Sequence, residues 1–302
     1  MCKREKDTGG NRIDFKHYLS EELEKYNGVA FPVKDGSFHR LITKKADVKS
    51  LHPNPEDEFC SPEIGPSYRI ISEYEAEYLD AMRRGQYYYS GEPVIVEKMH
   101  PDGYMIMNGH HRWAAAVRLG RKDIPVKIVN LTQKEDIKQM LRNSVHERRV
   151  TMDLDEVVFC TGEDMEAEAP LPAPWDRVYK EKLRRGIPAL FRYLRKNGFD
   201  IWVYSSEYYS FDFIQNLFKR YHADVTGVVT GTARKTGLKA ADKKKVEEKI
   251  ASRFLYTVHI DDGMVLKINS RTKDFEDYEL TGPRKRWARE VMETIRDNIL
   301  DK

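Results

Sequence analysis

The stretch VTMDLDEVVF, residues 150–159, decides how the second half of the chain folds. Its apolar residues predict a buried strand, and two carboxylates, Asp153 and Asp155, stand at the end of that strand. Residues two apart in a strand point to the same side, so both side chains are expected to face one place. In a doubly wound sheet, ligands bind at the carboxyl ends of the strands. The stretch indicates either such a site or an ordinary solvated acidic turn.

Strands alternate with helices from this stretch to the last residues. Further strands are expected at 200–204, 224–229 and 255–260, and helices at 180–197, 241–252 and 284–300. This alternation predicts an α/β unit with a parallel, doubly wound sheet.

Polar side chains follow the other expected strands of this unit. They are Ser205 and Ser206 after the second strand, Lys239 (or Lys235 or Lys243) before the next helix, and Asp261 and Asp262 after the last strand. Carboxylates that converge at one edge repel each other unless a hard cation such as Mg²⁺ lies between them. A serine and a lysine beside them would complement the oxygens of a phosphoryl group.

This order resembles the haloacid dehalogenase-like (HAD) phosphohydrolases across residues 148–302. The matching residues are DLDEV at 153–157, Ser205 or Ser206, Lys239, IDD at 260–262, and the helix-to-strand phrase GIPALFRYLRKNGFDIWVYSS at 186–206.

The resemblance implies a role for each carboxylate. Asp153 would be the nucleophile that forms an aspartyl-phosphate, and Asp155 would protonate the leaving oxygen and then activate water. Asp153, the backbone carbonyl of Asp155, and Asp261 or Asp262 would hold Mg²⁺. The insert at 162–174 is too short for a large cap domain, which implies that the substrate is large or is enclosed by the other domain.

The first half of the chain carries a second pattern, NGHHRW, at residues 108–113. It lies between an expected strand at 104–107 and a helix that begins near His111. Backbone N–H groups at a helix start favour an anion, and Arg112 can bind a phosphate through two hydrogen bonds. The alternatives are a histidine pair that is bonded to backbone groups and a glycine that serves a turn.

The wider stretch resembles the amino-terminal domain of ParB and the sulfiredoxin fold. The resemblance rests on ADVKSLHPNP at 46–55 and PVIVEKMHPDGYMIMNGHHRWAAAVRLGRKDIPVKIV at 93–129. It implies that Asn108, Gly109, His110, His111 and Arg112 bind nucleotide phosphates.

Free serine kinases of this fold are similar in the loop, and they carry a catalytic glutamate whose counterpart is Glu58 or Glu63. This chain departs from the pattern in two ways. Asn108 replaces the aspartate of those kinases, and His110 replaces the catalytic cysteine of sulfiredoxins. A HAD-like unit also stands where ParB proteins have a DNA-binding helix-turn-helix, which argues against chromosome partitioning.

Composition limits the remaining function classes. The 302 residues are 40% hydrophobic, enough for two cores, and no apolar run approaches the ~18 residues of a membrane span. Three separated cysteines without a CxxC pair argue against a disulfide scaffold and against a Cys-rich zinc site, and a cytoplasmic protein without membrane partners is expected. The formal net charge of +3 is spread evenly, which makes nucleic acid the less favoured partner.

These observations predict a polar arm and helix at 1–27, a ParB/sulfiredoxin-like α+β domain at 28–149 and a HAD-like domain at 150–302. The predicted function is Mg²⁺-dependent hydrolysis of a phosphomonoester, on a nucleotide, a phosphorylated small molecule or a phosphorylated end. The first domain would bind ATP or ADP, as a small-molecule kinase or as a specificity module. The alternative is a ParB-type nucleic-acid-binding, nuclease or nucleotide-switch protein with a regulatory HAD-like half.

Overall fold

The computed structural model describes residues 14–26, 28–36, 40, 44–85, 91–160, 165–232 and 240–301. The described chain packs as two compact units, one up to Val129 and one from Asn130 onward. Each unit contains one mixed sheet and its own hydrophobic core, so the fold class is α/β. Among the described helices, none is long and apolar enough to cross a membrane.

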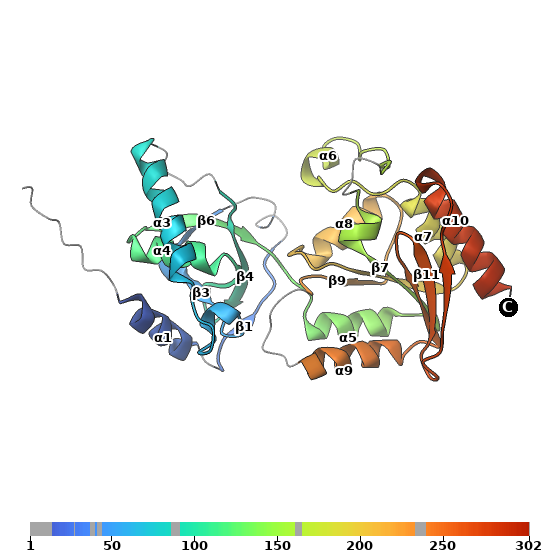
Figure 1. Ribbon diagram of the computed structural model, residues 1–302, viewed down its shortest axis with the longest axis horizontal. Helices are drawn as coiled ribbons and strands as arrows, with labels where there is room; N and C mark the ends of the chain where they lie inside the picture. The colour runs from blue at the N-terminus through green and yellow to red at the C-terminus, as the bar shows by residue number, and fades with distance from the viewer. Residues whose placement is uncertain are drawn as a thin grey trace, which may run out of the picture. The chain divides into compact units, whose positions relative to one another are not determined.

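The first unit is a sheet with helices packed against it (Figure 1). Its elements are α1 (Phe15–Lys25), β1 (Phe31–Pro32), β2 (Lys44–Asp47), β3 (Leu51–Pro53), α3 (Tyr68–Arg83), β4 (Val94–His100), β5 (Tyr104–Asn108), α4 (His110–Arg118) and β6 (Asp123–Ile128). The strand order is β2-β6-β4-β5-β3, and β1 pairs with β4. Helix α4 is the centre of the core, because Trp113 and the three alanines that follow it are completely buried.

The second unit begins with α5 (Lys134–Asn143), a helix that the sequence analysis assigned to the first domain. Gln133 and Asp136 form a capping box at its start. Its Met140 packs in a small cluster with Trp202, Ile250 and Phe254. Because these residues belong to the second sheet and its helix, the compact unit starts about twenty residues before the predicted boundary at 149/150.

The other elements of the second unit form a six-stranded sheet with helices on both faces. They are β7 (Arg148–Asp153), α6 (Trp175–Val178), α7 (Ile187–Lys196), β8 (Phe199–Tyr204), α8 (Phe211–Arg220), β9 (Gly227–Val229), α9 (Ala240–Ala251), β10 (Tyr256–Ile260), β11 (Met264–Asn269), β12 (Phe275–Glu279) and α10 (Trp287–Ile295). The order within the described residues is β12-β11-β10-β7-β8-β9. β10, β7, β8 and β9 are parallel, as predicted, whereas β11 and β12 are antiparallel and were not predicted.

Alternating side chains of β8 explain why helices cover both faces of this sheet. Ile201 and Val203 belong to the main core with α7, α8 and α10, whereas Trp202 belongs to the cluster with α5 and α9. Figure 1 shows α5 and α9 together on one side of the sheet and α7 and α10 on the other. The six residues of β8 are almost entirely buried, as expected for a strand that is covered on both faces.

The predicted strand at 150–159 is shorter in the structure. It ends at Asp153, and Leu154–Val158 form one π-helical turn. Asp153 and Asp155 therefore do not share the side of a strand, and that part of the prediction is wrong. Asp153 is the N-cap of this turn, because its side chain accepts hydrogen bonds from the first backbone N–H groups.

A substitution at Gly227 tests how closely the second sheet is packed. It lies beside Trp202 on the neighbouring strand, and a Cβ at this position would collide with the indole ring. We expect Gly227→Ala to lower the free energy of unfolding by about 1–3 kcal/mol through overpacking. Urea unfolding of the full chain, followed by tryptophan fluorescence, measures this loss.

Gly263→Ala is the matched control, since no atom would lie within 4 Å of its Cβ and its backbone is not left-handed. Equal unfolding midpoints for the two variants would contradict the packing that we describe.

Candidate functional site

Strand register brings three polar chain segments to one edge of the second sheet. Met152 pairs with Ile260 on β10, and Asp153 pairs with Tyr204 on β8. Asp261 and Ser205, the next residues along β10 and β8, therefore flank the end of β7. β7 has a parallel neighbour on each side: the chain adds β8 and β9 on one side of it and then returns to add β10 on the other. Ligands bind in such sheets at the point where the strand order reverses in this way.

One carboxylate oxygen of Asp153 is hydrogen-bonded to the chain, and the other is available to a ligand. Oδ1 accepts hydrogen bonds from the backbone N–H groups of Asp155 and Glu156, at 2.7 and 2.9 Å. Among the described residues, no hydrogen bond reaches Oδ2. The side chain is partly exposed, so a fixed carboxylate with one available oxygen stands at the strand edge.

Asp155 is held by the two serines that were predicted to contact phosphate. The Ser205 hydroxyl lies 3.1 and 2.8 Å from the two carboxylate oxygens, and the Ser206 N–H donates to Oδ2 at 3.1 Å. Ser205 is completely buried, whereas Ser206 is exposed. Ser205 thus positions Asp155 in this structure, and Ser206 is the serine whose hydroxyl reaches solvent.

The two aspartates after β10 have different surroundings. Asp261 turns back on the chain, and its Oδ1 accepts from the N–H of Asp262 at 2.7 Å. Asp262 forms an ion pair with Arg184 at 2.7 Å, and Arg284 lies 3.8 Å away. Of the two, Asp261 is the aspartate whose carboxylate is not paired with an arginine in the described structure.

The described residues contain no group of three or more His, Cys, Asp or Glu side chains that could hold a metal ion. The donors at this edge are nevertheless those that Mg²⁺ prefers, because it binds through one or two carboxylates and keeps several waters. Asp153 and Asp261 supply two carboxylates at adjacent strand ends. Asp153, Asp261 and the carbonyl of Asp155 are thus oxygen donors of the chemical kind that Mg²⁺ binds, whereas Asp262 is paired with Arg184.

The predicted lysine cannot be placed at this edge. Lys235 and Lys239 lie outside the described residues, and the side chain of Lys243 is not among those described.

Sequence reasoning missed Tyr209 and Arg184 near the edge. The Tyr209 ring packs edge-on against Phe159, and burial raises the pKa of its hydroxyl to about 12, with further contributions from Glu181, Asp155 and Glu207. Arg184 is buried with only 4% of its side chain exposed. Neither residue belongs to a motif, and a single tyrosine or arginine between helices gives no signal in sequence.

The loop at 108–112 in the first unit leads directly from β5 into α4. Gly109 is the N-cap with a φ of 97°, a left-handed conformation that favours glycine. Gly109 has no side chain that could cap the helix. A Cβ at this position would lie against the Arg112 guanidinium. Glycine is thus required both for the turn and for the room that Arg112 occupies.

Arg112 points into the protein. Its Nη1 donates to the carbonyl oxygens of Glu92 and Pro93, and its Nη2 donates to Asn108 Oδ1 at 3.3 Å. Only 7% of the side chain is exposed. In this conformation Arg112 and Asn108 tie α4 to the start of β4, and a phosphate at this loop would meet the backbone N–H groups of the first helical turn.

The two histidines of the loop bind backbone groups. His110 Nε2 accepts from the N–H of Asn54 at 3.2 Å, and His111 Nε2 accepts from the N–H of Ser67 at 3.1 Å. Their rings contact Phe59, which stacks on His110 at 5.3 Å. These contacts fasten the 52–67 segment to α4, and they leave neither Nε2 atom available to a metal.

The remaining predicted residues of the first unit lie in that segment. Glu58 begins a short 3₁₀ helix, Glu58–Cys60, and is exposed, as is Glu63. Asp57, which sequence reasoning passed over, caps this helix and lies 3.7 Å from His110 Nδ1.

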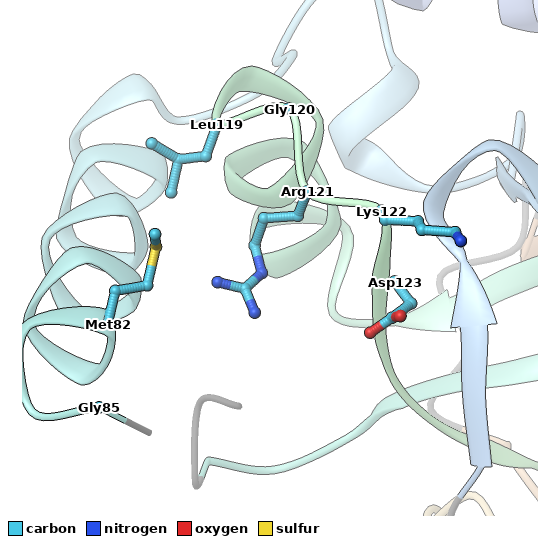
Figure 2. A pocket seen from close by; sticks show the side chains of 7 residues that line it. All are labelled: Met82, Gly85, Leu119, Gly120, Arg121, Lys122 and Asp123. Carbon is cyan, nitrogen blue, oxygen red and sulfur yellow. The ribbon is translucent and has the colours of Figure 1, made fainter. Parts of the chain in front are cut away.

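A cavity of about 390 Å³ lies at the opposite end of α4 from the loop (Figure 2). Its lining residues are Met82, Gly85, Leu119, Gly120, Arg121, Lys122 and Asp123. The Arg121 guanidinium there lies 4.9 Å from the centre of the Tyr78 ring. Since a nine-residue helix is about 14 Å long, this cavity is separate from the predicted phosphate loop.

Comparison with known protein families finds a similarity for part of the chain. Residues 76–145 match the ParB N-terminal domain. The match covers α3 from Ala76, β4, β5, α4 and β6 and continues through α5, so it includes the whole 108–112 loop. It confirms the ParB part of the resemblance and points to a role connected with nucleotides or nucleic acids. No curated protein matches the chain.

His110 makes the stability of the first unit depend on pH. Burial lowers its pKa to about 4, and the Asp57 carboxylate opposes this shift only in part. The unfolded chain binds a proton near the ordinary pKa of ~6.5, so stability is complete above that pH and falls as the pH drops toward 4. We expect a loss on the order of 3 kcal/mol, measured as urea unfolding of the full chain from about pH 7 to about pH 4.5.

His110→Gln keeps an acceptor for the Asn54 N–H and removes the imidazole that binds a proton. The free energy of unfolding of this variant should therefore fall less between about pH 7 and about pH 4.5. His17→Gln, at a side chain that is 73% exposed, is the control and should behave like the wild type. Parallel curves for the wild type and His110→Gln would show that His110 is not buried as described.

Proposed function

We propose that the second unit is a Mg²⁺-dependent phosphomonoesterase of the HAD-like type, and that the first unit binds a nucleotide. The observation that carries the proposal is the edge at which Asp153, Asp155 and Asp261 meet at the ends of parallel strands. Carboxylates that gather at a switch point repel each other. A bound cation would relieve this repulsion and would attract the phosphate of a substrate.

In the proposed reaction, Asp153 Oδ2 attacks the phosphorus atom of the substrate. The bond from phosphorus to the leaving oxygen breaks, and protonated Asp155 gives its proton to that oxygen. Asp155 then takes a proton from water, which attacks the phosphorus of the aspartyl-phosphate. Inorganic phosphate leaves, and the Asp153 carboxylate and the Asp155 proton are restored.

Two features of the structure support these roles. The hydrogen bonds to Asp153 Oδ1 fix the carboxylate while Oδ2 stays open to substrate. Ser205 and Ser206 orient Asp155 beside it. When bound by Asp153, Asp261 and the Asp155 carbonyl, Mg²⁺ would supply positive charge that draws in the phosphate and neutralises its oxygens.

For the first unit we propose nucleotide binding at the start of α4. The ParB match and the uncapped helix start support it. Because Arg112 is turned inward to the carbonyl groups of Glu92 and Pro93, the backbone N–H groups at the helix start would contact the phosphate in this proposal. Kinase activity is the narrower form of this proposal, and it would require Glu58 or Glu63 to act on a hydroxyl.

The ParB match also favours a second candidate function, nucleic-acid binding with a regulatory second unit. An affinity for DNA or RNA that falls steeply with salt would favour this function over hydrolysis.

The test is Mg²⁺-dependent phosphate release from nucleotides, phosphorylated small molecules and phosphorylated oligonucleotide ends. We expect Asp153→Asn to reduce release to background, because the amide cannot form the aspartyl-phosphate. Asp274→Asn, an exposed aspartate between β11 and β12, is the matched control and should retain full release. Phosphate release that persists in Asp153→Asn would overturn the assignment of the nucleophile.

A further inference from the structure

A side chain from the start of the second unit completes the edge strand β9. Within the described sheet β9 pairs with β8 only, so the backbone groups on its outer side have no neighbouring strand. The Thr132 hydroxyl takes that place, because it donates to the Val228 carbonyl at 3.0 Å and accepts from the Thr230 N–H at 3.0 Å. Thr132 and Thr230 are both buried, where unpaired backbone groups would be costly.

The end of β9 in turn holds the backbone of the segment that follows β8. Ser205 donates its N–H to the Val229 carbonyl at 2.9 Å, and the Ser205 carbonyl accepts from the N–H and the hydroxyl of Thr232, both at 3.1 Å. The Gly231 N–H donates to the Glu207 carbonyl at 2.9 Å. The position of Ser205 therefore depends on where the end of β9 lies.

Ser205 is the residue that connects this backbone to Asp155. Its hydroxyl lies 2.8 Å from Asp155 Oδ2 and accepts from the Glu207 N–H at 3.0 Å. A path of hydrogen bonds thus runs from Thr132 through the end of β9 to Ser205 and Asp155. Thr132, Thr230 and Ser205 are almost completely buried, so bulk water does not replace a bond that is lost from this path.

A second pair of hydrogen bonds begins two residues before Thr132. The Asn130 N–H donates to the Ser210 hydroxyl at 3.0 Å, and the Asn130 carbonyl accepts from the Phe211 N–H at 3.0 Å. We call residues 130–132 the bracing segment. It holds the loop after β8 at both ends, at Ser210 directly and at Ser205 through β9.

We propose that Thr132 and Ser210 are positioning residues, and that the bracing segment keeps Asp155 in the orientation that proton transfer requires. The inference rests on the proposed function, in which Asp155 protonates the leaving oxygen. A general acid must stay within hydrogen-bond reach of the atom that it protonates, so a small displacement slows the reaction.

The test compares single substitutions in the full-length chain. Thr132→Val keeps the shape of the side chain and removes the hydroxyl, which leaves the Val228 carbonyl and the Thr230 N–H without this partner. Thr132→Ser keeps the hydroxyl and is the conservative variant. Thr257→Val is the matched control, because the buried Thr257 hydroxyl accepts from Arg149 near the other end of β7 and β10.

We expect Thr132→Val to lower kcat for Mg²⁺-dependent phosphate release about tenfold, because Asp155 acts on the leaving oxygen in the transition state. KM should stay close to the wild-type value, since the Asp153 carboxylate is not changed. Thr132→Ser and Thr257→Val should both keep a kcat close to that of the wild type.

A wild-type kcat in Thr132→Val would overturn the inference. An equal loss of kcat in Thr257→Val would also overturn it, since kcat would then follow stability alone. If Thr132→Val does not fold, Ser210→Ala replaces it, because this variant removes the acceptor of the Asn130 N–H. The same loss of kcat at an unchanged KM is expected in Ser210→Ala, and an unchanged kcat would overturn the inference.

Amide hydrogen exchange separates this inference from the proposed function, because it needs no turnover. The N–H groups of residues 205–207 are all bonded within the path, and we expect them to exchange about tenfold faster in Thr132→Val than in Thr257→Val or the wild type. Faster exchange in a protein that releases no phosphate would contradict the phosphatase and keep the bracing segment. Unchanged exchange would overturn the bracing segment even in an active enzyme.

Discussion

The site in the second unit depends on the parallel pairing of β7 with β10 on one side and β8 on the other. This register is held by burial, because the apolar residues of the three strands that face the main core have no exposed surface; they are Val150, Met152, Ile201, Val203, Val258 and Ile260. A slip of one residue would turn these side chains to the wrong face. It would also move Asp261 and Ser205 away from Asp153, so the packing of the core fixes the relation between the polar strand ends.

Several features of this edge could be predicted from sequence, since they follow from strand ends. The parallel strands β7, β8, β9 and β10 were predicted, and with them the gathering of Asp153, Ser205 and Asp261. Side-chain direction could not be predicted in the same way. The pattern 108–112 suggested a phosphate contact for Arg112, whereas the guanidinium turns inward to carbonyl groups of the preceding segment. Which way an arginine turns depends on acceptors far away in sequence, and periodicity carries no information about them.

The two units use their polar residues for different purposes. In the first, buried polar groups such as His110 and Arg112 are bonded to backbone atoms, and they hold the loop before α4 in shape. In the second, the Asp153 carboxylate is fixed through Oδ1, and Oδ2 accepts no hydrogen bond from the described residues. A ligand can complete a fixed, partly exposed oxygen of this kind, and for that reason we propose that the chemistry belongs to the second unit.

The central claim is that Asp153 carries the phosphoryl group during turnover, and covalent trapping tests it most directly. A single turnover with a ³²P-labelled phosphomonoester would be quenched in acid and the protein digested to peptides. The account predicts acid-stable label on the peptide that contains Asp153, and no label on that peptide in Asp153→Asn. Turnover without label on this peptide, or label on a different residue, would contradict the account.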